Sequence, residues 1–242
     1  MNRLFTAGCV LALGLVMPAF AEDTKGKDDK PNPAAKNLNR DNDRHKLFLD
    51  RIEKSKKVVI FLGDSITHGW EGQKAWKEHF GEFHPVNLGI GGDQTGHVLW
   101  RITEGKELAH LKPKVAVIMI GTNNGHSAAH VAGGIKAIVE ELKKQKPHIK
   151  ILVLGVFPRG SGVKGDKSIP AAKLSKKVTA INAIIAKLDD GKTVFYKDIG
   201  NTFLAEDGGL SREIMDDYLH LTAKGYAIWG KAIKEDIEKL LK

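Results

Sequence analysis

The amino-acid sequence predicts an α/β protein, a three-layer α/β/α sandwich built on a central five-stranded parallel sheet. Two observations support this prediction. Short, continuously apolar runs bounded by Gly, Pro or Asn recur along the chain, as is typical of strands buried on both faces. Between these runs lie longer segments in which apolar residues recur at helical spacing. This alternation favours a parallel sheet with right-handed crossovers and helices on both faces.

The expected elements follow one another after residue 40. Phe48, Leu49 and Ile52 recur at helical spacing, which indicates an amphipathic helix ahead of the first strand. The apolar runs expected to form the sheet cover residues 58–62, 85–88, 115–120, 151–156 and 193–196. The helices expected between and after them cover residues 73–80, 95–104, 128–146, 167–188 and 222–241. Because the pattern shows no internal repeat and no second domain, residues 41–242 are expected to form one domain.

Residues 1–21 are expected to be a cleavable secretory signal. Arg3 gives a positive start, residues 9–16 are mostly apolar, and Ala19-Phe20-Ala21 matches the small-x-small pattern of a cleavage site. The apolar run is too short to serve as a stable membrane anchor. We therefore expect cleavage after Ala21 and a mature protein that is secreted or periplasmic.

Residues 22–40 carry almost no apolar side chains, so they are expected to be a flexible linker.

Composition argues against several classes of function. The net charge is +9, but no nucleic-acid motif or aromatic stacking array accompanies it, and no nucleic-acid partner is expected. Cleavage of the signal would remove the single cysteine, Cys9, and with it any disulfide or thiol nucleophile. No ligand grouping stands out at the expected site, so neither a metal nor another cofactor is expected.

Four polar segments carry the residue types that acyl transfer needs. GDSIT (63–67), GIGGD (89–93) and GTNN (121–124) each follow an expected strand, and DDYLH (216–220) precedes the last helix. Because the carboxyl ends of parallel strands meet at one edge of a sheet, we expect the first three segments to lie together. Acyl transfer requires a nucleophile, a base, a group that orients the base, and donors for an oxyanion.

Ser65 is the expected nucleophile, because its hydroxyl can attack an ester carbonyl once a neighbouring base takes its proton. His220 is the expected base. Asp217 stands three residues earlier, a spacing that lets its carboxylate hold the imidazole from one side of a turn. Asp64 is expected to bind the backbone of the turn instead. Other candidates near this edge are Asp216, His68, His97 and His126.

The four segments resemble, in order and approximate spacing, the sequence blocks of the SGNH (GDSL-type) hydrolases. NLGIGGDQTGHVLWRI, PKVAVIMIGTNN and DYLHLTAKGY are similar to stretches of the platelet-activating-factor acetylhydrolase catalytic-subunit group. The resemblance covers residues 44–241 and implies a flavodoxin-like hydrolase fold. It also implies an oxyanion hole made by the backbone N–H groups of Ser65 and Gly92 and the side-chain amide of Asn123, with Asn124 as the second choice.

The sequence and this resemblance together favour a secreted serine esterase that removes short acyl groups, acetyl above all, from a glycan or small-molecule ester. Ile66, Thr122 and Leu219 adjoin the expected catalytic residues, and we expect them to wall a small acyl pocket. A lysophospholipase or lipase with a long acyl groove is one alternative. A non-catalytic binding module on the same fold is the other. Relatives of this group are often dimers, so the resemblance also allows a homodimer.

Overall fold

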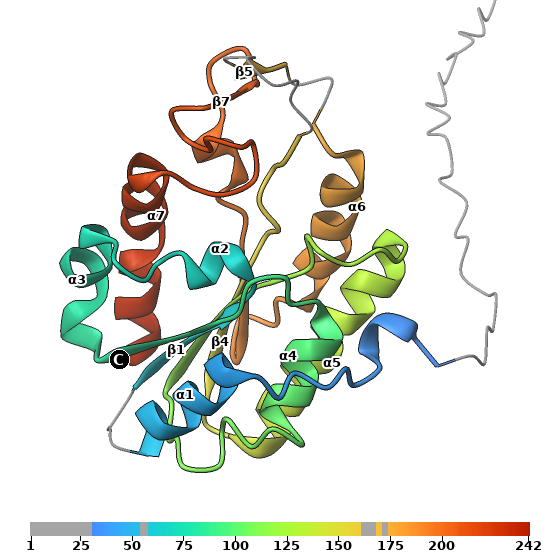
Figure 1. Ribbon diagram of the computed structural model, residues 1–242, viewed down its shortest axis with the longest axis vertical. Coiled ribbons are helices and arrows are strands. Elements are labelled where there is room, and N and C mark those ends of the chain that lie inside the picture. Colours follow the sequence, from blue (N-terminus) through green and yellow to red (C-terminus); the bar gives the residue numbers. More distant parts are fainter. Residues whose placement is uncertain (1–30, 54–57, 161–167, 171–173) are drawn as a thin grey trace, which may run out of the picture. The chain divides into compact units, whose positions relative to one another are not determined.

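The computed structural model describes residues 31–53, 58–160, 168–170 and 174–242 (Figure 1). The expected signal sequence and its cleavage site lie outside the described residues. Five parallel strands form the central sheet in the order β2-β1-β3-β4-β6, which confirms the predicted class and strand number. The strands are β1 (Val59–Gly63), β2 (Pro85–Gly89), β3 (Val115–Met119), β4 (Lys150–Leu154) and β6 (Val194–Lys197).

Helices cover both faces of this sheet. The α-helices are α1 (Asp43–Glu53), α2 (Ser65–His68), α3 (Lys74–Phe80), α4 (Thr95–Ile102), α5 (Ala128–Gln145), α6 (Lys176–Ile185) and α7 (Ala223–Leu241). Short 3-10 helices are η1 (Pro33–Ala35), η2 (Gly81–Phe83), η4 (Ala186–Leu188) and η5 (Gly200–Phe203). No helix of the described ranges is both long and apolar enough to cross a membrane.

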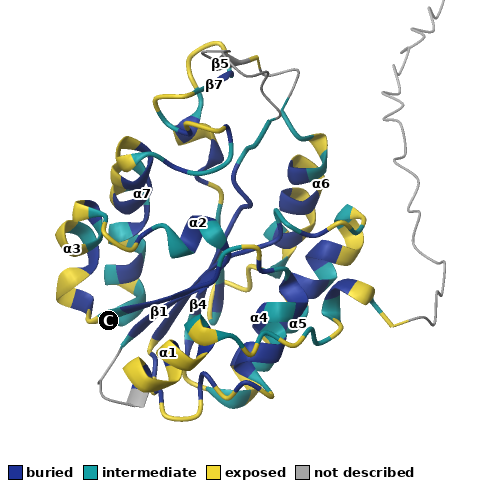
Figure 2. Ribbon diagram, in the orientation of Figure 1, coloured by how far each residue is buried: buried dark blue, intermediate teal, exposed yellow. Residues whose placement is uncertain are grey.

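The side chains of β1 alternate between two apolar cores, because successive residues of a strand face opposite sides of a sheet. Ile60 and Leu62 pack with residues of α1, α4, α5 and α6, whereas Val59 and Phe61 pack with residues of α3 and α7. Figure 2 shows the strands and the inner faces of the helices as buried. The sheet is therefore the middle of three layers.

One predicted helix begins later than expected. The helix predicted over 167–188 starts at Lys176, and Ser168–Ile169 instead form strand β5, which pairs antiparallel with β7 (Leu210–Ser211). Pro170 accounts for this difference, because the residue before a proline is biased toward an extended conformation.

Residues 31–40 correct the prediction of a flexible linker over 22–40, since this described part packs against the domain. Ala34 is buried, and its carbonyl oxygen accepts a hydrogen bond of 2.6 Å from the hydroxyl of Thr95. The backbone N–H of Leu38 donates to the carbonyl oxygen of Gly96 at 3.1 Å. A polar segment is ordered here through its backbone groups, which an argument from apolar content does not detect.

Candidate active site

The sheet order brings the first three polar segments together. Strands β2, β1 and β3 are neighbours in the sheet, and each ends in one of these segments. Ser65 begins α2 directly after β1, Gly92 lies in the loop after β2, and Asn123 lies in the loop after β3. The fourth segment reaches the same edge, because His220 contacts Ser65 from a position 155 residues later in the chain.

Ser65, His220 and Asp217 form a continuous chain of hydrogen bonds. Ser65 Oγ lies 2.8 Å from His220 Nε2, and His220 Nδ1 lies 2.6 Å from Asp217 Oδ2. Asp217 Oδ1 also accepts the backbone N–H groups of His220 and Leu219, at 2.7 and 3.0 Å. With its Nδ1 proton held by the carboxylate, the imidazole presents Nε2 to the serine as a proton acceptor.

The carboxylate of Asp217 is stabilised in its charged form. Partial burial opposes ionisation, but the hydrogen bonds from the backbone of His220, its ring and the backbone of Leu219 outweigh burial and hold the pKa of Asp217 below its ordinary value. Asp216, the neighbouring candidate, is exposed, and its carbonyl oxygen accepts a hydrogen bond from Arg212 Nε at 2.7 Å. The geometry therefore pairs His220 with Asp217.

Asp64 lies directly before the serine and holds the turn rather than the imidazole. Its Oδ1 accepts the backbone N–H of Ile66 at 2.9 Å, which caps α2. Its Oδ2 is buried and has no hydrogen-bond partner among the described residues. Complete burial raises the pKa of Asp64 to about 7, since a carboxylate is costly to charge away from water.

The loop of residues 90–93, called the Gly92 loop below, passes beside Ser65. A Cβ added to Gly91 would lie 3.8 Å from the Cβ of Ser65. Gly92 has a φ of +79°, a left-handed conformation that glycine adopts without steric cost. It is exposed, and the missing Cβ leaves its backbone open to a ligand.

Asn123 joins this loop to the one after β3. Its Nδ2 donates to the carbonyl oxygen of Asp93 at 3.0 Å, and its side chain is half-buried. Asn124 is 4% exposed and binds Thr95, the first residue of α4. Its Oδ1 accepts the N–H of Thr95 at 3.2 Å, and its Nδ2 donates to Thr95 Oγ1 at 3.0 Å. Asn123 is therefore the more accessible of the two asparagines.

Comparison with known proteins identifies the family. Residues 61–228 match the model described as the GDSL-like Lipase/Acylhydrolase family. The chain belongs to this family. Platelet-activating factor acetylhydrolase IB subunit alpha2 of Gallus gallus is 38% identical over 227 residues, covering 93% of this chain and 90% of the relative. The alpha1 subunit of Homo sapiens is 38% identical over 199 residues, covering 81% of this chain and 82% of the relative.

Solved structures share the fold. A GDSL-like lipase from Bacteroides thetaiotaomicron has a TM-score of 0.63 at 23% identity and covers 81% of this chain and 97% of its own. A carbohydrate acetylesterase from Sinorhizobium meliloti has a TM-score of 0.57 at 20% identity and covers 76% of this chain and 100% of its own. Family membership makes the protein a hydrolase of the esterase type.

The expected acyl wall is wrong for Ile66 in this GDSL-like acylhydrolase. Ile66 is 1% exposed and packs in the apolar core, and its carbonyl oxygen accepts the hydroxyl of Tyr226 at 2.7 Å. It therefore lies behind the nucleophile, because its side chain takes the inward-facing position in the first turn of α2. Thr122 and Leu219 are half-buried, and Leu219 packs against the core cluster that contains Ile66.

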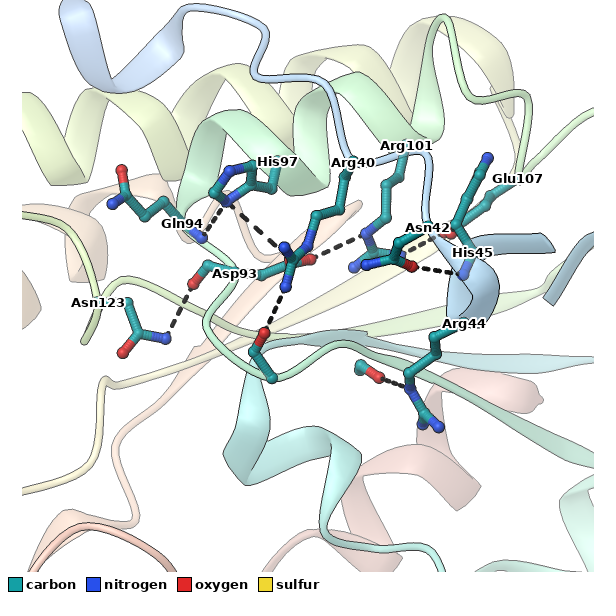
Figure 3. A network of polar contacts seen from close by, with 12 residues as sticks. Arg40, Asn42, Arg44, His45, Asp93, Gln94, His97, Arg101, Glu107 and Asn123 are labelled. Carbon is teal, nitrogen blue, oxygen red and sulfur yellow. Dashed lines mark hydrogen bonds and ion pairs between the residues drawn. The ribbon is translucent and has the colours of Figure 1, made fainter. Parts of the chain in front are cut away.

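Two buried arginine contacts near the acylhydrolase site have no counterpart in the sequence prediction (Figure 3). Arg40, from the segment before α1, donates from Nε to Asp93 Oδ1 at 2.7 Å and from its NH2 group to the carbonyl oxygen of Gly91. Arg101 of α4 donates from Nε to Asp93 Oδ2 at 2.9 Å. Asp93 is fully buried, so these two guanidinium groups hold the Gly92 loop from its inner side.

The network continues away from the site. Arg101 also pairs with Glu107 Oε2, and Glu107 Oε1 lies 2.9 Å from His45 Nδ1. Arg101 and Glu107 are fully buried, and His45 is 3% exposed. Arg101 stands between Trp100 and Ile102 in an apolar helix. A cation in such a position needs a buried carboxylate, so this pattern in the sequence indicates a buried ion pair at Arg101.

The competing histidines make other contacts. His97 Nδ1 accepts the backbone N–H of Gln94 at 2.9 Å, and His126 Nδ1 lies 3.5 Å from Asn124 Nδ2. His68 lies at the end of α2, 3.9 Å from Glu71. Within the described ranges, no three His, Cys, Asp or Glu side chains gather in an arrangement that could hold a metal ion.

Proposed function

We propose that this family member is a serine esterase that hydrolyses acetyl esters with Ser65 as nucleophile. The observation that carries the proposal is the chain of hydrogen bonds from Ser65 Oγ through the imidazole of His220 to Asp217, with distances of 2.8 and 2.6 Å. A binding module would have no need for a serine, a base and an orienting carboxylate in this arrangement, whereas acyl transfer requires all three.

In the proposed reaction, His220 takes the hydroxyl proton as Ser65 Oγ attacks the ester carbonyl. The resulting oxyanion is stabilised by the backbone N–H groups of Ser65 and Gly92 and by the side-chain amide of Asn123. His220 then gives its proton to the departing alcohol, which leaves an acyl-enzyme. A water molecule, deprotonated by the same imidazole, hydrolyses the acyl-enzyme and releases the acid.

The acetyl preference rests on the relatives. Proteins named platelet-activating factor acetylhydrolases match this chain at 38% identity over nearly its whole length. Leu219 and Thr122 are half-buried chain neighbours of His220 and Asn123, and the proposal assigns them the role of limiting the room for a longer acyl chain. A lipase or lysophospholipase reading would instead require an extended apolar groove at this position.

A panel of p-nitrophenyl esters of rising acyl length tests the proposal. The wild-type protein should be most active on the acetyl ester, with kcat/KM falling steeply for longer chains. Ser65→Ala should lower kcat/KM by about 10⁴-fold or more while the protein stays folded. A preference for long chains would favour the lipase reading. A protein that hydrolyses none of the esters would favour the binding module.

We propose further that the protein acts outside the cytoplasm. The proposal rests on the signal-like composition of residues 1–21. N-terminal sequencing of the protein purified from its native host should begin at Glu22. A mature chain that retains Met1 would contradict export by this route.

A further inference from the structure

A small cavity of about 200 Å³ lies beside the loop that carries Asn123. Gly121 and Thr122 line it. Arg159, after β4, and Lys177, in the first turn of α6, line it as well. Two cationic side chains from separate elements thus converge on one cavity next to the proposed oxyanion hole.

Both cations bind neutral oxygens on either side of Asn123. Arg159 donates to the carbonyl oxygen and to the hydroxyl of Thr122, both at 3.2 Å. Lys177 Nζ donates to the carbonyl oxygen of Asn124 at 2.6 Å. Both side chains are half-buried, and within the described residues the hydrogen bonds of their charged groups go to neutral oxygens and not to a carboxylate. Two partly desolvated charges that have no counter-ion within the described part of the chain attract an anion more strongly than fully solvated charges do.

Chain neighbours of the lining residues connect the cavity to the proposed active site. Thr122 directly precedes Asn123, and Gly160, which follows Arg159, donates its backbone N–H to the carbonyl oxygen of Tyr218 at 3.3 Å, two residues before His220. Ser175, which precedes α6, also lines the cavity, and its side chain makes no capping hydrogen bond to that helix. A hydroxyl donor therefore stands beside the two cations.

We propose that Arg159 and Lys177 form an anion subsite that binds a carboxylate on the alcohol part of the ester. This inference rests on the proposed esterase function and narrows its substrates to acetylated acids, such as acetylated uronic acids. The guanidinium of Arg159 uses one nitrogen for Thr122, which leaves further N–H donors for a carboxylate. The ammonium of Lys177 likewise uses one of its three hydrogens for Asn124.

The kinetic test compares two substrates that differ only in charge, acetylated glucuronic acid and acetylated glucuronamide, with acetate release as the readout. The wild-type KM for the acid should be about tenfold or more below that for the amide, in line with a charge-assisted hydrogen bond. Raising the salt concentration should narrow the difference. Acetylated glucose 6-phosphate shows whether a phosphate occupies the subsite as well as a carboxylate does.

Arg159→Gln and Lys177→Gln should each bring the ratio of the two KM values close to one. Lys176→Gln is the matched control, because Lys176 is the exposed neighbour in α6 and does not line the cavity, so this variant should keep the wild-type ratio. Equal losses of kcat on both substrates, with the KM ratio unchanged, would show that the cations only support the Asn123 loop. That result would overturn the proposal.

A binding measurement separates this proposal from the esterase proposal. In the Ser65→Ala background, calorimetry should detect acetylated glucuronic acid, with an affinity about tenfold weaker once Lys177→Gln is added. If wild type hydrolyses both esters with equal KM values, the anion subsite is wrong and the esterase stands. If wild type hydrolyses neither ester but binds the acid in a Lys177-dependent way, the esterase is wrong and the subsite stands.

Discussion

The turn that carries Ser65 and the Gly92 loop lie side by side, yet different interactions hold them. The Ser65 turn rests on apolar packing, since Ile66 and Trp70 are each 1% exposed and belong to the core that includes residues of α7. The Gly92 loop rests on charge. Its Asp93 is fully buried between the guanidinium groups of Arg40 and Arg101 (Figure 3).

This difference predicts that the two regions respond differently to a single substitution. Apolar contacts stabilise in proportion to buried area and are spread over many neighbours. A buried ion pair depends on both partners, because loss of one leaves the other charged and unpaired. A single substitution in the charge network should therefore disturb the Gly92 loop more than a comparable change disturbs the Ser65 turn.

Arg101→Met should give the largest loss of stability. It removes the shared partner of Asp93 and Glu107 and leaves each of these two buried carboxylates with one side-chain hydrogen bond, from Arg40 and His45 respectively, so we expect a loss of about 3–5 kcal/mol in urea unfolding. Lys74→Met is the control, because it breaks an exposed pair with Glu78 and should cost about 1 kcal/mol or less. Similar losses of stability in the two variants would show that the buried charge network is no more sensitive to substitution than an exposed ion pair.

Asp217→Asn should act on rate rather than on stability. Asp217 is exposed, unlike Asp93, but it orients His220, so kcat should fall on the order of a hundredfold or more with little change in unfolding. Asp216→Asn should stay close to wild type, because Asp216 is exposed and its contact with Arg212 is made by the backbone carbonyl, which the substitution leaves in place. Steady-state kinetics on the acetyl ester measure kcat for both variants. Equal losses of kcat in the two would mean that Asp217 has been assigned the wrong role.

Asp64 is the one buried carboxylate in the Ser65 turn, and it should make stability depend on pH. Burial raises its pKa to about 7, above the unfolded value, so the folded state keeps a proton that the unfolded state loses above pH 4. Its contribution is full below pH 4 and disappears as pH rises to 7, a loss of about 2–3 kcal/mol between pH 5 and pH 8.

Urea unfolding of wild type and Asp64→Asn at these two pH values measures that contribution. The variant keeps an oxygen for the N–H of Ile66 but has no charge to bury, so its decline from pH 5 to pH 8 should be smaller than that of wild type. Asp41→Asn, at an exposed position, should follow the wild-type decline. Parallel declines for all three proteins would show that Asp64 is not the titrating group.

Local sequence patterns predicted the features that depend on residues close together in the chain. The strands follow from continuous apolar runs, and the pairing of Asp217 with His220 follows from a spacing of three residues within one turn. The pairing of Arg40 with Asp93 in the charge network could not be predicted in this way. Arg40 and Asp93 are 53 residues apart, and neither neighbouring residues nor periodicity indicates that they meet. The late start of α6 is different, because Pro170 stands in the sequence and signals it.

The inward direction of Ile66 also required the structure. Adjacency to Ser65 indicates proximity to the carbonyl, but the first turn of α2 sends the next side chain into the core. The order of residues 31–40 depends on partners such as Thr95 and Gly96, which belong to a distant part of the chain. Composition alone therefore indicates how much apolar surface a segment can bury. It does not indicate which backbone N–H and C=O groups of the segment find hydrogen-bond partners.

Arg40→Met should have a small effect on stability and still reduce the rate. Arg40 is 27% exposed and Asp93 keeps Arg101, so unfolding should change by only about 1 kcal/mol. The loss of the contact to the carbonyl oxygen of Gly91 should let the Gly92 loop move, and kcat should fall about tenfold with little change in KM.

Two further variants show whether the position of the loop is the cause. Arg40→Lys keeps the charge but lacks the planar fork that reaches Asp93 and Gly91 together, so it should restore only part of kcat. Lys46→Met removes a charge from an exposed position in α1 and should leave kcat unchanged. If Arg40→Met keeps the wild-type kcat, Arg101 alone positions the loop, and the segment before α1 stabilises the fold without supporting the oxyanion hole.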